Sequence, residues 1–157
     1  GGFAGGPPGG GFGGGPPGGG APGGFGGDTA SLSTAIRYAQ SHGGGTIGVS
    51  SQSSAAQEIL STHADVAGLG GFSGRESSVS VSWLAAEVRA GRLRWVLSDA
   101  GSGPRLPGDT RLGSQTAMSA VAKACRAVSV TGTGGTSVSL YDCQARAAAI
   151  IAASRAS

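Results

Sequence analysis

The sequence has only two cysteines, two histidines and one lysine, and these shortages exclude several classes of protein. A structural zinc site needs about four Cys or His ligands at short spacings, and neither His42 nor His63 stands at such a spacing from a cysteine. No apolar run approaches the roughly 20 residues that cross a bilayer. The 11 basic side chains are scattered, whereas nucleic-acid binding needs a basic stripe. We therefore expect no metal site, no membrane span within these residues and no nucleic acid among the partners.

Residues 1–27 differ in composition from the rest of the chain. They hold more than half of the 33 glycines and most of the seven prolines, and otherwise only alanines and three phenylalanines in similar GGF contexts. Such a segment cannot bury enough apolar surface to offset the entropy lost on ordering. We expect a disordered linker over 1–27, roughly 30 Å across as a Gly-rich coil, and one folded domain over 28–157. The lack of an initiator methionine and of a signal peptide indicates a piece of a longer protein.

Beyond the linker, helical and strand patterns alternate with short connections. The helices are expected at 28–42, 53–61, 80–90, 114–128 and 145–153, and the strands at 46–50, 65–69, 93–97 and 138–141. The inward-facing stripes of the first two helices are expected to be Leu32, Ala35, Ile36 and Ala39, then Ala56, Ile59 and Leu60. Trp83 and Trp95 are both expected to pack in the core. The alternation predicts an α/β fold, a three-layer α/β/α sandwich with a mostly parallel sheet.

Polar and glycine-rich segments follow the first three predicted strands. Ligands of open α/β sheets bind at the carboxyl ends of parallel strands, so these segments should meet at one edge. Backbone amides of the GGFSG loop, and free amides at the helix start beside Ser51 and Gln52, favour a phosphate or a sugar hydroxyl, and Phe72 could face a sugar ring or fill the core. The candidate ligand-binding residues are Ser51, Gln52, Gly70, Gly71, Phe72, Ser73, Gly74, Glu76 and Asp99. Simple capping and turn formation are the alternative roles of these residues.

The only two cysteines, Cys125 and Cys143, favour a disulfide. Such a bond would contribute on the order of 3 kcal/mol by closing a short loop. Disulfides persist in oxidising compartments, so a disulfide would indicate an extracytoplasmic location. Two reduced, buried thiols in a cytosolic core are the alternative.

Two catalytic or cofactor-binding hypotheses fit the sequence poorly. The nucleophile elbow of a serine hydrolase would need a glycine at position 75, but the residue there is Arg75. In addition, His63 precedes Ser73, whereas in that fold the catalytic serine comes before the histidine in the chain. The glycines at 132, 134 and 135 lack the spacing of a dinucleotide-binding loop, and a strand follows them. We therefore expect no cofactor and no catalytic residue, with a serine hydrolase as a remote alternative.

Three sequence strings carry a resemblance to a known family. They are VAGLGGFSG at 66–74, GRLRWVL at 91–97 and LYDC at 140–143. Together they resemble the C-terminal extracytoplasmic domain of bacterial membrane glycosyltransferases of the GT-C type, the ArnT-like mannosyltransferases of the YkcA/YkcB-like group. The resemblance covers about residues 30–144. That group often has an acidic residue soon after GGFSG, and Glu76 can fill this position.

The resemblance implies a parent enzyme that takes a sugar from a polyprenyl-phosphate donor at the outer face of the bacterial cell membrane. Its catalytic carboxylates would lie in a membrane-embedded portion, and no catalytic residue carries over to this chain. The implied role is a non-catalytic accessory domain that binds a glycan, an acceptor or a lipid-phosphate head group. A structural cap, or a domain that docks a protein partner on the membrane enzyme, is the alternative.

Overall fold

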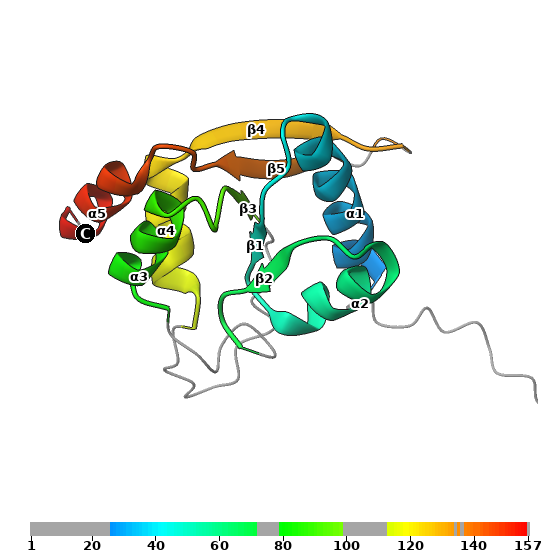
Figure 1. The fold of residues 1–157 in the computed structure, drawn as a ribbon, viewed down its shortest axis with the longest axis horizontal. Coiled ribbons are helices and arrows are strands. Elements are labelled where there is room, and N and C mark those ends of the chain that lie inside the picture. Colours follow the sequence, from blue (N-terminus) through cyan, green and yellow to red (C-terminus); the bar gives the residue numbers. More distant parts are fainter. Residues whose placement is uncertain (1–25, 72–78, 99–112, 134, 136, 157) are drawn as a thin grey trace, which may run out of the picture.

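The computed structural model describes residues 26–71, 79–98, 113–133, 135 and 137–156, and these form one five-stranded sheet with helices on both faces (Figure 1). The strands lie in the order β2-β1-β3-β5-β4. Their bounds are β1 Ile47–Val49, β2 Val66–Gly68, β3 Trp95–Leu97, β4 Arg126–Thr131 and β5 Ser137–Asp142. The helices are α1 Gly26–Ser41, α2 Gln52–Thr62, α3 Val81–Arg89, α4 Gln115–Ala124 and α5 Ala147–Arg155.

Two hydrophobic cores separate the three layers. The core under α1 and α2 contains Leu32, Ile36, Val49, Trp95, Leu97 and Leu140. The core under α3, α4 and α5 contains Leu69, Leu84, Val88, Val96, Val121 and Ile150. Because successive strand residues point to opposite faces, Trp95 and Leu97 enter the first core while Val96 enters the second. The predicted α/β fold with helices on both faces of a sheet is confirmed.

The sheet is mixed, because the hairpin of β4 and β5 adds an antiparallel strand to the parallel strands β1, β2 and β3. β1 pairs in parallel with β2 and with β3, whereas β5 pairs antiparallel with both β3 and β4. Among the described strands, four therefore run in one direction and only β5 runs in the other. We predicted that the helix beginning near residue 114 continues to Val128, and this was wrong. The helix ends at Ala124, since Val128 and Val130 alternate with polar residues and pair with Leu140 and Val138 of β5.

The buried stripe of α1 was predicted correctly, but that of α2 was not. Ile59 is 39% exposed and Leu60 is 81% exposed, whereas Ala55 is buried. The helix lies over β2, an edge strand, so the sheet covers only a narrow stripe of it (Figure 1). Trp83 on α3 is also 48% exposed, against the prediction that it packs in the core, while Trp95 is 2% exposed as predicted. An apolar pattern alone does not show which side of a short helix meets a sheet.

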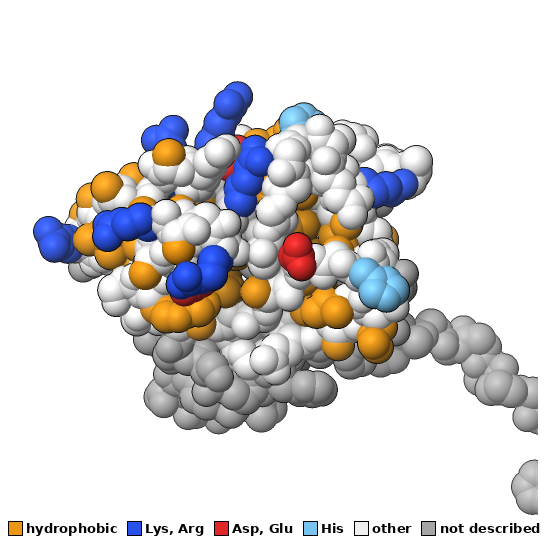
Figure 2. Space-filling view, viewed as in Figure 1, with side chains coloured by type: hydrophobic (Ala, Val, Ile, Leu, Met, Phe, Trp, Pro, Cys, Tyr) orange, Lys and Arg blue, Asp and Glu red, His pale blue; other side chains and the backbone are white. Residues whose placement is uncertain are grey.

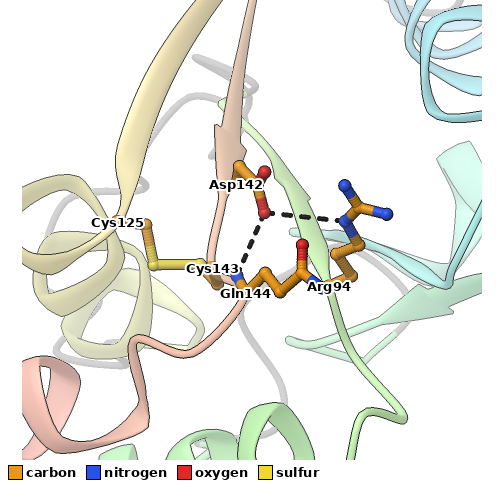
Figure 3. The surroundings of a disulfide bond; sticks show 5 residues. All are labelled: Arg94, Cys125, Asp142, Cys143 and Gln144. Atoms are coloured by element: carbon orange, nitrogen blue, oxygen red, sulfur yellow. Dashed lines mark hydrogen bonds and ion pairs between the residues drawn. A yellow bond between two sulfur atoms is a disulfide. The ribbon is translucent and has the colours of Figure 1, made fainter. Parts of the chain in front are cut away.

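The predicted disulfide is present between Cys125 and Cys143, whose Cα atoms are 4.7 Å apart. Cys125 directly follows α4, and Cys143 follows β5, so the bond joins a helix layer to the sheet (Figure 3). Cys143 is fully buried, and Tyr141 packs against the same core. No helix among the described residues is long and apolar enough to span a membrane.

The start of α2 packs against β2 at a position that excludes a side chain. A Cβ atom at Gly68 would lie 2.6 Å from Cγ of Gln52 and 2.9 Å from its backbone Cα and N. Contacts this short require movement, and the backbone of a helix start cannot move without disturbing the helix. Glycine at position 68 therefore sets the distance between α2 and the sheet.

We expect the double substitution Cys125→Ala/Cys143→Ala to lower the free energy of unfolding by about 3 kcal/mol, because the bond closes a loop in the unfolded chain. Urea denaturation of both proteins, with and without a thiol reductant, measures this. The reductant should destabilise the native protein and leave the variant unchanged. Equal stability of native protein and variant under oxidising conditions would contradict the role given to the bond.

We expect Gly68→Ala to destabilise the domain by about 1–3 kcal/mol, the usual cost of overpacking. Thermal unfolding followed by circular dichroism measures the change. Adding Gln52→Ala to this variant removes the clash with Cγ but leaves both backbone contacts. The second substitution should therefore restore only a small part of the loss, and full recovery would show that the side chain alone was the obstacle.

The carboxylate of Glu87 accepts hydrogen bonds of 2.7 and 2.6 Å from Arg92, just beyond the end of α3. These bonds lower the pKa of Glu87 from its usual value. A pKa that is lower in the folded protein than in the unfolded chain stabilises the fold at any pH above the pKa that Glu87 has in the unfolded chain. This stabilisation is lost as the pH falls through the pKa that Glu87 has in the folded protein. We expect Glu87→Gln to be less stable than the native protein at neutral pH, with the difference shrinking below about pH 4. Urea denaturation at several pH values tests this, and a difference independent of pH would contradict it.

Candidate functional site

The carboxyl ends of three neighbouring parallel strands meet at one edge of the sheet. β1 lies between β2 and β3, with Val49 opposite Gly68 and Gly48 opposite Val96. The segments that follow these strands begin at Ser50, Leu69 and Ser98, so they start side by side. The predicted convergence of the first three strand ends therefore holds in the sheet topology.

The first two of these segments are directly bonded. The backbone N–H of Gln52 donates to the carbonyl oxygen of Gly71 over 2.7 Å, and that of Leu69 donates to Val49 over 2.8 Å. We predicted free amides at the start of α2, but the amide of Gln52 already has this partner within the protein. Gly71 has a φ of 79°, as expected for a tight turn. The loop after β2 is thus fixed against the start of α2.

The side chains at this edge differ in their access to solvent. Ser51 is buried at 5% exposure and has an interaction partner within the protein. Gln52 is exposed, and Gly70 is buried beside it. The structure thus brings Ser51, Gln52, Gly70 and Gly71 together, with the Gln52 side chain as the accessible polar group among them. The other predicted site residues, Phe72, Ser73, Gly74, Glu76 and Asp99, lie outside the described residues.

The opposite edge of the sheet holds a group of charged and aromatic residues that no sequence pattern indicated as a site. The guanidinium of Arg94 lies 4.4 Å from the ring centroid of Trp95 and, through Nε, 3.7 Å from Oδ1 of Asp142. The ring of Tyr38 meets Trp95 edge to face, with centroids 5.7 Å apart. Three of these residues, Arg94, Trp95 and Asp142, belong to the strings GRLRWVL and LYDC, which were recognised only as sequence signatures.

The described surface contains no group of three or more His, Cys, Asp or Glu side chains that could hold a metal ion. On the face shown in Figure 2, Lys and Arg side chains are spread around the molecule and do not form one continuous stripe. The charges that bear on a site are therefore local, and one such local group is the pair Arg94 and Asp142.

Comparison with known proteins finds one family. No curated protein and no solved structure matches the chain. The family model described as putative mannosyltransferase YkcB-like, C-terminal, matches residues 35–124, from within α1 to the end of α4. This match covers more than half of the chain and includes the strands β1, β2 and β3. The chain therefore belongs to the family of putative mannosyltransferase YkcB-like C-terminal domains.

Proposed function

We propose that this chain is the non-catalytic accessory domain of a membrane mannosyltransferase that uses a polyprenyl-phosphate sugar. Its ligand is a glycan, the acceptor or the lipid-phosphate head group, bound at the edge where β2, β1 and β3 end. The observation that carries this proposal is the fixed contact between the start of α2 and Gly71 beside the exposed Gln52. Membership of a mannosyltransferase family supports the substrate class.

The rigidity of this edge supports a binding role. Gly68 leaves no space for a Cβ atom against Gln52, and Gly71 accepts the Gln52 amide, so α2 and the loop after β2 hold each other in place. A preorganised site loses less entropy when it binds a ligand. In the proposed site the Gln52 side chain supplies a donor and an acceptor for a hydroxyl or phosphate group, and Ser73, Glu76 and Asp99 are proposed to complete it.

The proposed partners and location follow from the family and from the disulfide. We propose that the catalytic carboxylates belong to a membrane-embedded portion of the same protein, with which this domain works. The Cys125–Cys143 bond favours the extracytoplasmic face of the bacterial cell membrane, because disulfides persist in oxidising compartments.

A second candidate function is a structural cap that docks a protein partner. Ile59, Leu60 and Trp83 are large apolar side chains that remain exposed on α2 and α3. Exposed apolar groups of this kind are enriched at protein interfaces. In this case the domain would support sugar transfer without contacting sugar.

We expect mannose oligomers or a short-chain polyprenyl phosphate to shift the backbone amide resonances of Gln52, Gly70 and Gly71 in the isotope-labelled chain. Gln52→Ala should weaken binding about threefold to tenfold, the effect of one hydrogen bond. Gln40→Ala is the matched control, because Gln40 is also an exposed helical glutamine and lies on α1.

Unchanged amide resonances at millimolar ligand, or equal effects of the two glutamine substitutions, would reject the proposed edge. Sugar transfer by the parent enzyme then separates the two candidate functions. Activity that survives Gln52→Ala but is lost with Leu60→Ser and Trp83→Ser together would favour the docking cap.

A further inference from the structure

A cavity of about 430 Å³ lies at the edge of the sheet opposite the proposed ligand-binding edge. Its lining includes Tyr38, His42, Arg94, Trp95, Arg126 and Asp142. These residues come from the end of α1, the start of β3 and the adjoining ends of β4 and β5. We propose that this cavity binds a small oxyanion, a phosphate ester or a carboxylate, independently of the first site.

Strand register builds the floor of this cavity. Asp142 lies opposite Trp95 on one neighbouring strand and opposite Arg126 on the other. Directly paired residues point to the same face of a sheet, so all three belong to the face that α1 covers. The disulfide fixes this row, because Cys125 precedes Arg126 and Cys143 follows Asp142. The covalent bond thus holds two charged groups of the cavity at a set separation.

A glycine loop holds Arg94 in place. A Cβ atom at Gly45 would lie 3.1 Å from Cβ of Arg94, and one at Gly43 would lie 3.1 Å from a terminal guanidinium nitrogen. The carbonyl of Arg94 accepts a 2.8 Å hydrogen bond from the amide of Cys143. The neighbouring Trp95 donates its indole N–H to the carbonyl of Gly44 over 2.9 Å. The segment 43–45 therefore follows the end of α1 and also positions Arg94 and Trp95.

The contact with Asp142 does not use all the hydrogen-bond donors of the Arg94 guanidinium. Nε lies 3.7 Å from Oδ1 of Asp142, beyond hydrogen-bond length, and is buried without a hydrogen-bond partner among the described residues. The same Oδ1 accepts a 3.0 Å bond from the amide of Gln144. Figure 3 shows the two terminal nitrogens of Arg94 on the side of the guanidinium away from Asp142. These nitrogens form the planar fork that recognises phosphate and carboxylate groups.

Arg126 adds a second cation to the cavity. It is exposed, and its side chain has no hydrogen bond or ion pair with any described residue. Two arginines and one aspartate line the cavity, so these three side chains carry an excess of one positive charge. A carboxylate already bonded to Gln144 and close to Arg94 offers less repulsion to an anion than a free one would.

The aromatic residues form part of the cavity wall, but they do not present an exposed ring face on which a sugar could stack. Arg94 covers a face of the Trp95 ring, and Trp95 is 2% exposed. The rings of Tyr38 and His42 stack on each other with centroids 3.9 Å apart. The interaction available to a ligand is therefore mainly electrostatic, and the volume is within the range of small-molecule sites.

The two tryptophans make a direct test possible with the full chain and its disulfide intact. Inorganic phosphate, glucose 1-phosphate, glucuronate and glucose are titrated into isotope-labelled protein. We expect the three anions to shift the indole N–H resonance of Trp95 and to leave that of Trp83 on α3 unchanged. Arg126→Ala should weaken anion binding at least about tenfold, as expected for a charge-assisted hydrogen bond. Arg155→Ala, at the exposed end of α5, is the matched control and should have no effect.

The anions distinguish the source of the binding group. Preference for phosphate and glucose 1-phosphate assigns the cavity to a phosphate ester, and preference for glucuronate assigns it to a carboxylate. Equal binding of neutral glucose, equal loss in both arginine variants, or no shift of Trp95 at about 10 mM anion would overturn the proposal. Because amides of Gln52 and Gly71 report the other edge, failure of one site is distinguishable from failure of the other.

Discussion

The covalent bond between Cys125 and Cys143 is the constraint on which the outer half of the sheet depends. β4 is an edge strand that pairs only with β5 among the described strands, and a two-stranded hairpin is marginally stable in water. The bond anchors the start of β4 to the end of β5 and ties both to α4. With this end fixed, Asp142 aligns with Trp95 and Arg126 in one row across three strands.

The parallel half of the sheet depends on burial of both faces. β1 is central to that half and is fully buried, and helices cover it on both sides because a parallel strand needs a crossover to its neighbour. The same topology places the ends of β2, β1 and β3 at one edge and the preceding turns at the other. The fold therefore presents two chemically different edges, one with glycine and small polar residues and one with guanidinium, carboxylate and aromatic groups.

Local sequence signals predicted the elements whose burial is nearly complete. The stripe of Leu32, Ala35, Ile36 and Ala39 could be assigned because α1 lies across several strands, and a whole helical face is covered. The stripe of α2 could not, since Ile59 and Leu60 have the right spacing but face beyond the edge of the sheet. Residues 126–128 were predicted to be the end of a helix, because one apolar residue every few positions fits both the helical and the strand period. Pairing with β5 decides between the two, and that partner lies beyond a turn.

The amino-acid sequence alone specified the α/β alternation, the pairing of the only two cysteines and the segments that follow the parallel strands. These properties depend on local periodicity, on glycine positions and on the absence of any other thiol. The meeting of Arg94, Trp95, Asp142 and Arg126 depended on strand order, because residues far apart in the chain become neighbours only when β5 inserts between β3 and β4. Side-chain exposure on α2 and α3 likewise depended on which element each helix packs against. A local sequence pattern does not indicate that element.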